Sequence, residues 1–146
     1  QAARQDIELV LGEPSEAVVY GDHGQLLTAL RNLMSNAISY SPAHTRVAVG
    51  AREVEGIVEI AVKDQGIGIP VNDLDRIFER FYRVDRARSR DTGGTGLGLS
   101  IVRHVANNHG GTVSVTSIEG EGSVFRLSIP TQQTDPTLVG QGEVTP

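Results

Sequence analysis

The sequence predicts an α+β fold, a two-layer sandwich in which one sheet packs against helices. Short segments of alternating or continuous apolar residues, typical of strands, occur in both halves of the chain. Longer segments with apolar residues at helical spacing lie between them, and no internal repeat is present. Strands grouped around three helical segments indicate this layered architecture.

Turn and cap residues set the limits of these elements. A turn at residues 12–15 separates the first two strands, and one at 119–122 joins the last two in a hairpin. Asp22 is placed to cap the start of the first and longest helix. Strands are predicted over residues 6–11, 17–20, 46–53, 56–64, 112–118 and 123–129. Helical segments are predicted over residues 23–40, 72–81 and 97–109.

Composition excludes several classes of protein. The net charge of −5 argues against nucleic-acid binding, and no apolar run reaches the roughly 18 residues of a membrane span. The absence of cysteine excludes disulfides and thiolate metal sites and favours a cytosolic setting. The chain starts at Gln1 without a methionine, so we expect a part of a larger protein. We predict one domain over residues 1–130 and a disordered tail over 131–146, where apolar residues are few.

The long helix carries the first candidate site. Asn32, Asn36 and Tyr40 recur every four residues and therefore share one face, with Ser39 close by. One interpretation is that they are ordinary polar surface residues. Asparagine is a mediocre helix former, however, so two of them one turn apart on a packed helix need another explanation. An amide oxygen can occupy one corner of a magnesium octahedron while phosphates and waters fill the others, which makes Mg²⁺ binding the alternative.

A second candidate site follows the strand at 56–64. This strand ends on Asp64, and Gly66 and Gly68 then allow a sharp turn. One interpretation is a plain turn at the end of a strand. The other is a carboxylate at the floor of a pocket, where glycines leave room for a flat ring. Such a carboxylate can accept a hydrogen bond from an exocyclic amine, which adenine has and guanine lacks at that position.

A third candidate site is a glycine cluster, Gly93, Gly94, Gly96 and Gly98, directly before the last helix. A glycine turn that leads straight into a helix presents free N–H groups and the positive end of the helix dipole to an anion. It is not a Walker loop, because no Gly-Lys-Ser/Thr follows, and a loop instead of a strand precedes it.

The order and spacing of these motifs resemble the catalytic ATP-binding domain of bacterial sensor histidine kinases. The resemblance covers residues 6 to 130 and includes four sequence boxes in the family's order. The N box is similar to residues 32–42, the G1 box to 64–68, the F box (Phe-x-x-Phe) to 78–83 and the G2 box to 94–99. The segment 120–125 is similar to the family's last hairpin.

The resemblance implies a Bergerat ATP-binding fold: a mixed sheet with three helices on one face and ATP under a mobile lid. It implies that Asn36 binds Mg²⁺, that Asp64 binds adenine with Tyr40 against the ring, and that the glycines of the G2 box lie near the phosphates. Asn36, Arg80 and Arg83 are the residues expected to act in catalysis. The residues expected to bind the nucleotide are Asn32, Asn36, Ser39, Tyr40, Asp64, Gly66, Gly68, Ile69, Phe81, Gly94, Thr95, Gly96, Leu97, Gly98, Leu99 and Ser123.

Two positions depart from related proteins. The family usually has Lys or Arg where this chain has Ser39, so we expect Arg80 or Arg83 to reach the phosphates when the lid closes. The alternative is that these arginines belong to a solvated loop. Related ATPases have a glutamate, the general base that activates water, where this chain has Asn32. An amide cannot take a proton at neutral pH, which favours phosphoryl transfer over hydrolysis.

The acceptor of the phosphoryl group is expected on another domain. None of the four histidines, His23, His44, His104 and His109, lies in the family's phosphoacceptor motif. The resemblance therefore implies a histidine-bearing dimerisation domain and a response regulator as partners, and a cytoplasmic position in a membrane-anchored kinase. A hydrolytic ATPase of the same superfamily and a non-catalytic nucleotide-binding module are the alternative functions.

Overall fold

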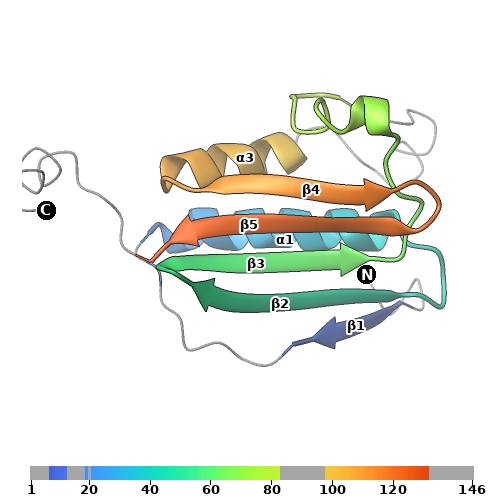
Figure 1. Cartoon of the computed structure of the whole chain (residues 1–146), viewed down its shortest axis with the longest axis horizontal. Helices are drawn as coiled ribbons and strands as arrows, with labels where there is room; N and C mark the ends of the chain where they lie inside the picture. Colours follow the sequence, from blue (N-terminus) through green and yellow to red (C-terminus); the bar gives the residue numbers. More distant parts are fainter. Residues whose placement is uncertain (1–6, 13–18, 20, 83–97, 132–146) are drawn as a thin grey trace, which may run out of the picture.

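A computed structural model describes residues 7–12, 19, 21–82 and 98–131 of the chain. A five-stranded sheet forms one layer, and two helices, α1 and α3, form the other layer behind it (Figure 1). The elements in chain order are β1 (Glu8–Leu11), α1 (His23–Ser39), β2 (Arg46–Val54), β3 (Ile57–Asp64), the 3-10 helix η1 (Val71–Asp73), α3 (Gly98–Asn108), β4 (Thr112–Ile118) and β5 (Gly122–Pro130). This arrangement confirms the predicted α+β sandwich.

The sheet is mixed, with the strand order β1-β2-β3-β5-β4. Among the strands that the structure describes, β1 alone pairs in parallel, with β2, and the other neighbours are antiparallel. The register places Asp64 of β3 between Val47 of β2 and Ser123 of β5. The sheet thereby brings two predicted nucleotide-binding residues from distant parts of the chain side by side.

The predicted long helix forms with the cap that the sequence indicated. A side-chain oxygen of Asp22 accepts a hydrogen bond of 3.0 Å from the backbone N–H of Gln25, one of the free donors of the first turn. The fully buried residues of this helix, α1, recur every four residues and face the sheet. They are Ala29, Leu33 and Ala37. None of the helices in the described residues is long and apolar enough to span a bilayer.

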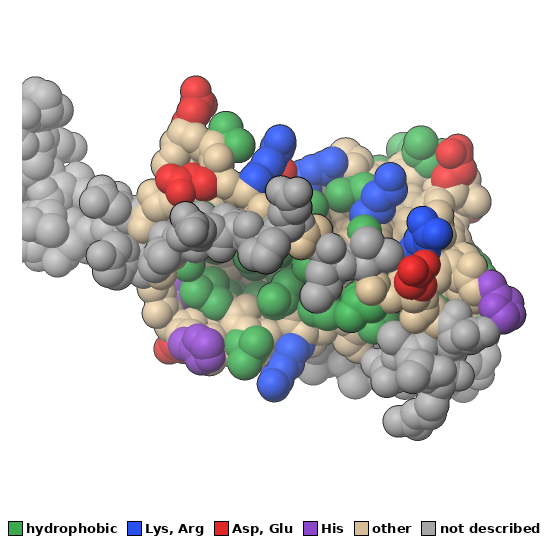
Figure 2. Space-filling model, turned by 90° about the horizontal axis from the view of Figure 1, so that it is seen from below, with side chains coloured by type: hydrophobic (Ala, Val, Ile, Leu, Met, Phe, Trp, Pro, Cys, Tyr) green, Lys and Arg blue, Asp and Glu red, His purple; other side chains and the backbone are tan. Residues whose placement is uncertain are grey.

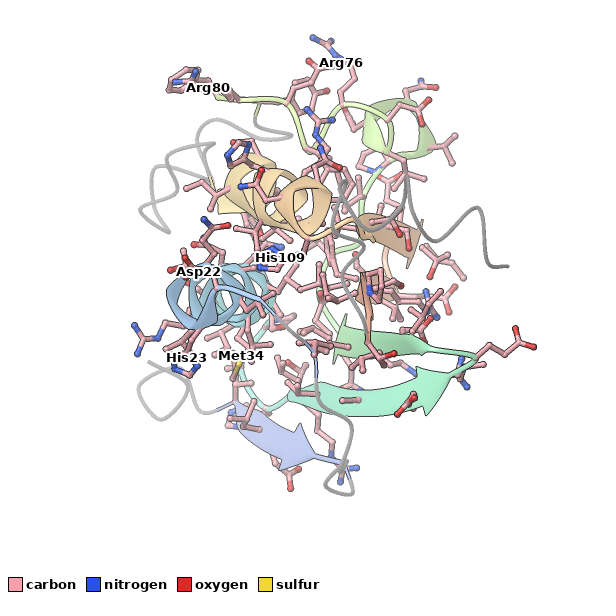
Figure 3. The ribbon with its side chains drawn as sticks, turned by 90° about the vertical axis from the view of Figure 1, so that its left-hand side faces the viewer. Asp22, His23, Met34, Arg76, Arg80 and His109 are labelled. Atoms are coloured by element: carbon pink, nitrogen blue, oxygen red, sulfur yellow. The ribbon has the colours of Figure 1, made fainter. Side chains whose placement is uncertain are left out.

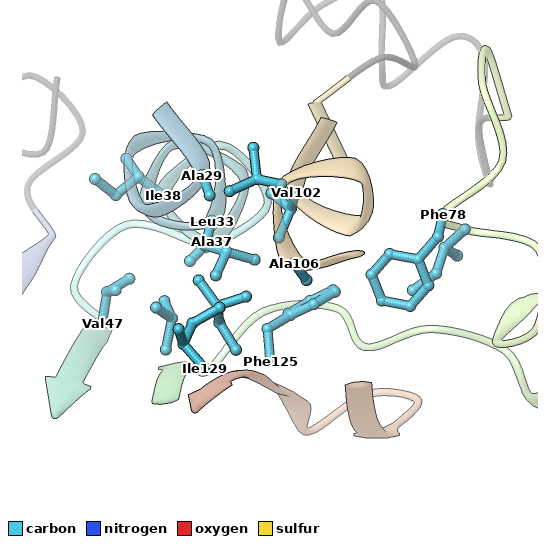
Figure 4. Close-up of a cluster of buried hydrophobic side chains, with 14 of the residues drawn as sticks. Ala29, Leu33, Ala37, Ile38, Val47, Phe78, Val102, Ala106, Phe125 and Ile129 are labelled. Atoms are coloured by element: carbon cyan, nitrogen blue, oxygen red, sulfur yellow. The ribbon is translucent and has the colours of Figure 1, made fainter. Parts of the chain in front are cut away.

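The core lies between the sheet and the helices (Figure 4). Inward-facing residues alternate along β5, where Phe125, Leu127 and Ile129 are almost wholly buried. Phe78, the first phenylalanine of the predicted F box, packs edge-on against Phe125 with ring centroids 6.1 Å apart. This contact fastens the segment after β3 to the sheet.

The two faces of the sheet differ in character. Seen from the β1 edge, hydrophobic side chains gather between the sheet and α1, and charged side chains lie mainly on the helix-free side (Figure 2). Cross-strand ion pairs lie on that side, including Arg46–Glu8 at 2.8 Å and Arg52–Glu59 at 3.3 Å. The helix-free face is therefore polar, as expected for a mainly antiparallel sheet with one solvated face.

Three predicted segments differ from the structure or lie at least partly outside the described residues. The strand predicted over residues 17–20 lies outside the described residues except for Val19, which is not in a strand. The predicted helix over 72–81 is wrong as a regular helix: η1 is followed by separate turns, with Glu79 N–H bonded to Arg76 O and Tyr82 N–H to Glu79 O. The apolar spacing of this segment serves to bury Ile77 and Phe78, which turns achieve as well as a helix. The predicted tail lies outside the described residues from 132 onward.

Candidate nucleotide-binding site

Asp64 lies buried at the end of β3, with only 6% of its surface exposed. Its Oδ1 atom accepts hydrogen bonds from the backbone N–H groups of Gly66 at 2.8 Å and Ser123 at 3.2 Å. Burial raises the pKa of the Asp64 carboxyl above its usual value, and the two hydrogen bonds, which lower it, offset only part of that shift. In the described residues both hydrogen bonds to this carboxylate end on Oδ1, so Oδ2 is the atom that can face a ligand.

The glycines after Asp64 are required by close contacts. A β-carbon on Gly66 would lie 2.5 Å from the carbonyl oxygen of Tyr40, well inside van der Waals contact. Gly68 has φ +73°, and its β-carbon would lie 2.3 Å from the carbonyl oxygen of Ile118. The loop after β3 thus lies tightly between the end of α1 and the β4–β5 hairpin. Neighbouring backbone therefore fills the positions beside these two glycines, which do not leave the room for a flat ring that the pocket-floor interpretation of the sequence predicted. The case for Asp64 as a ligand-binding carboxylate rests on its burial and on its second oxygen.

A serine that the sequence pattern did not single out holds this loop in place. Ser117 Oγ accepts a hydrogen bond of 2.8 Å from the N–H of Ile69, and it lies 2.8 Å from Ser123 Oγ. It also donates to the carbonyl of Gly122 at 3.0 Å. The sequence held one indication of this role. Ser117 continues the alternation of Val113 and Val115 in β4 and therefore faces inward, where a serine needs hydrogen-bond partners.

The polar face of α1 lies beside the start of α3. Asn32, Asn36 and Tyr40 are all partly buried, as a shared face at the border of the core requires. A β-carbon on Gly98, the first residue of α3, would lie 3.6 Å from Asn32 Oδ1. The structure therefore brings the predicted N box and the end of the predicted G2 box together. Ser39 and Leu99 are also partly buried, and Leu99 packs against the core.

This pair of helices offers amide oxygens and a helix N-terminus instead of a carboxylate cluster. The described residues contain no group of three or more His, Cys, Asp or Glu side chains that could hold a metal ion by themselves. Such a donor set suits an Mg²⁺ ion that takes one amide oxygen from the protein and its other ligands from phosphates and water. Asn36 fits that requirement.

The second phenylalanine of the F box lies at the surface. Phe81 is 62% exposed and has φ +66°, a left-handed conformation that is uncommon for a bulky residue. The guanidinium of Arg80 stacks 5.1 Å from the centroid of its ring, on the outside of the molecule (Figure 3). Arg83, Gly94, Thr95, Gly96 and Leu97 lie outside the described residues.

A further cluster closes the segment between η1 and Tyr82. The Tyr82 hydroxyl donates a hydrogen bond to Asp73, and the guanidinium of Arg76 lies 4.6 Å from the centroid of the Tyr82 ring. The hydrogen bond to Asp73 is the main cause that raises the pKa of Tyr82. The sequence pattern did not indicate this cluster, because the two ends of the segment meet only after it folds into turns.

Comparison with known proteins identifies the family of this chain. The family model described as "Histidine kinase-, DNA gyrase B-, and HSP90-like ATPase" matches residues 21–133. The sensor-like histidine kinase SenX3 of Mycolicibacterium smegmatis is 54% identical over 129 residues, which cover 88% of this chain and 34% of that protein. The chain therefore belongs to this family, and it spans about a third of the length of SenX3.

Two solved structures share the fold. The mycobacterial sensor histidine kinase MprB is 31% identical with a TM-score of 0.74, and the match covers 91% of this chain and 88% of that one. Full-length ShkA, solved in complex with AMPPNP, is 31% identical with a TM-score of 0.76, over 91% of this chain and 27% of that one. The predicted likeness to the catalytic ATP-binding domain of sensor histidine kinases is confirmed.

Proposed function

We propose that the chain binds Mg²⁺–ATP and transfers the γ-phosphoryl group to a histidine on a separate domain of the same kinase. The observation that carries this proposal is the pair of separate polar sites on one domain: a buried carboxylate at Asp64, and the Asn32 face of α1 beside the start of α3. One ATP molecule would occupy both sites, with its adenine at Asp64 and its phosphates beside Asn32.

The adenine end rests on Asp64. Its Oδ2 atom accepts a hydrogen bond from the exocyclic amine of adenine, while Oδ1 stays bonded to the Gly66 and Ser123 backbone. Guanine carries a carbonyl oxygen at the corresponding position and would face the carboxylate with an acceptor, so ATP is preferred to GTP. Tyr40 lies against the ring.

The phosphate end rests on α1 and α3. The N–H groups at the start of α3 and its dipole attract the phosphates, and Asn36 supplies an amide oxygen to Mg²⁺. When bound, the ion neutralises phosphate charge and holds the γ-phosphoryl group for in-line attack. Because Ser39 replaces a cation, Arg80 or Arg83 provides the remaining positive charge.

Transfer is favoured over hydrolysis because Asn32 cannot act as a general base toward water. A neutral imidazole nitrogen of the acceptor attacks the γ-phosphorus, the bond from phosphorus to the ADP oxygen breaks, and phosphohistidine and ADP are formed. The phosphoryl group then passes to a response regulator. The named relatives are sensor histidine kinases, which supports this role. We also propose a cytoplasmic position in a membrane-anchored kinase, which the sequence resemblance implies.

The test supplies the missing acceptor. The chain is incubated with γ-labelled ATP and Mg²⁺, alone and with the histidine-bearing hairpin domain of its own kinase. We expect acid-labile label on the hairpin only, and none when Asn36→Ala replaces the wild type. Rapid phosphate release without a partner would instead support a hydrolytic ATPase. Nucleotide binding with neither transfer nor release would indicate a non-catalytic module.

A further inference from the structure

A buried histidine joins the end of α3 to the start of α1. His109 is only 4% exposed, and its Nε2 atom accepts a hydrogen bond of 3.0 Å from the backbone N–H of Asp22. Its Nδ1 atom lies 2.8 Å from the carbonyl oxygen of Val105, one turn earlier. Because one partner is a donor and the other an acceptor, the ring must be neutral with its hydrogen on Nδ1.

Close packing around His109 adds to this contact between the end of α3 and the start of α1, which we call the joint at His109. A β-carbon on Gly21 would lie 2.4 Å from Cδ2 of the imidazole, so the chain before α1 lies directly against the ring. The neighbouring Asn108 donates a hydrogen bond of 3.3 Å to the side chain of Gln25 in the first turn of α1. Asp22 and His109 lie together at this end of the helix pair (Figure 3).

The opposite end of α3 is Gly98, which lies against Asn32. The two helices therefore run antiparallel and touch at both ends of α3. The 11 residues of α3 rise about 16 Å, and the stretch of α1 from Asp22 to Asn32 rises about 15 Å. Because these lengths match and a helix transmits displacement along its axis, the bond at His109 helps to set where Gly98 lies along α1, together with the packing of Val102 and Ala106 in the core.

We propose that His109 is a positioning residue for the phosphate end of the nucleotide site. It acts through α3, by holding Gly98 at the level of Asn32 and of the magnesium-binding face of α1. This inference rests on the proposed nucleotide binding. It adds a residue that does not touch the nucleotide and yet affects how tightly the site binds the phosphates. The adenine end is independent of α3, because Asp64 is held by the backbone of Gly66 and Ser123 and the loop after it packs against the end of α1.

Two substitutions separate the two hydrogen bonds of the ring. His109→Gln places an oxygen near the position of Nε2 and keeps an acceptor for the Asp22 N–H. His109→Asn places an amide near the position of Nδ1 and keeps only the bond to Val105, within α3. The exposed His104 on the same helix provides the control, His104→Asn.

Affinities for Mg²⁺–AMPPNP and for adenosine are measured with the whole chain of 146 residues. We expect His109→Asn to weaken Mg²⁺–AMPPNP binding about five- to tenfold, the value of one positioned hydrogen bond, without changing adenosine binding. His109→Gln and His104→Asn should bind both ligands as the wild type does. A purely structural histidine would give equal losses for Asn and Gln, or equal losses for both ligands, and either result would overturn the inference.

Gly21→Ala tests the joint from its other side, because the added methyl group pushes the imidazole away from Asp22. It should reproduce the loss of Mg²⁺–AMPPNP affinity, and it should have little further effect in the His109→Asn background. Additive effects would contradict a shared joint. If the wild-type chain bound neither ligand, both the proposed function and this inference would be contradicted. If the variants bound both ligands with unaltered affinity, the inference alone would be contradicted.

Discussion

At the residue scale, Asp64 is held in an environment that opposes its own charge. The folded-state pKa of its carboxyl is raised by burial, so the folded chain binds the proton more tightly than the unfolded chain does. The stability that this proton linkage contributes is fully present below the unfolded-state pKa and is lost as pH rises through the folded-state pKa. Above the folded-state pKa the buried charge therefore destabilises the fold, at the position that we propose to bind adenine.

Asp64→Asn should thus separate stability from function. The free energy of unfolding should rise above the folded-state pKa of Asp64, and its excess over the wild type should shrink as pH falls below that pKa and vanish below the unfolded-state pKa. Affinity for ATP should fall about ten- to a hundredfold, because an amide cannot replace a charged acceptor. Chemical denaturation across pH and calorimetry measure the two effects, with the exposed Asp75→Asn as control. Unchanged ATP affinity would contradict the adenine assignment.

The metal assignment concerns Asn36. Asn36→Ala should weaken Mg²⁺–ATP binding by about tenfold or more while changing the affinity for metal-free ATP little, since only the former loses a ligand. Calorimetric titrations with magnesium and with a chelator make the comparison. Equal losses in both titrations would show that Asn36 has a structural role.

Ser39 occupies the position where related kinases usually have a lysine or an arginine. Ser39→Lys should tighten ATP binding about two- to fivefold, the value of a partly exposed ion pair, and the gain should shrink as salt is added. Titrations at low and high ionic strength measure it. An unchanged dissociation constant would mean that arginines already satisfy the phosphates, in which case Arg80→Ala and Arg83→Ala should be the damaging changes.

Candidate site residues that depend on short spacing can be singled out in the sequence, although their roles stay predictions. Asp64 follows a strand and precedes two glycines, and Asn32 and Asn36 share a helical face, so each was recognisable locally. Ser117 and His109 were not, because their partners Ile69 and Asp22 lie tens of residues away in the sequence. Only the register of β4 and the crossing of α1 by α3 bring these pairs together.

At the element scale, the segment from η1 to Tyr82 shows where apolar spacing misleads. Burial of Ile77 and Phe78 is compatible with a helix or with turns, and the choice depends on contacts at the ends of the segment. Here Tyr82 bonds back to Asp73, which closes the segment into turns. The long helix α1 was predicted correctly because its cap and its apolar face agree over 17 residues.

The two phenylalanines of the F box should differ sharply in their effect on stability. Phe78 is buried edge-on against Phe125, so Phe78→Ala should lower the free energy of unfolding by about 3–5 kcal/mol. Phe81 is exposed, so Phe81→Ala should change it by less than about 0.5 kcal/mol. Denaturant unfolding of both variants measures the difference. Equal losses would contradict the placement of Phe81 at the surface.

At the scale of the whole molecule, the two layers have different tasks. The sheet and the hairpin that follows β4 fix Asp64, whereas the helices carry the asparagine face and the start of α3. The proposed nucleotide spans both layers, and the joint at His109 holds the two helices of its phosphate end in register with each other. We therefore expect base and phosphate recognition to be perturbed separately.

Backbone amide signals of the ¹⁵N-labelled chain test this division most directly when they are followed during titration with adenosine, Mg²⁺–tripolyphosphate and Mg²⁺–ATP. Adenosine should shift the signals of Gly66 and Ser123, which bond to Asp64, and tripolyphosphate should shift those of Gly98 and Asn36. Mg²⁺–ATP should shift both sets at once. Adenosine that moves Gly98 and leaves Gly66 and Ser123 unchanged would contradict a site with its base on the sheet and its phosphates on the helices.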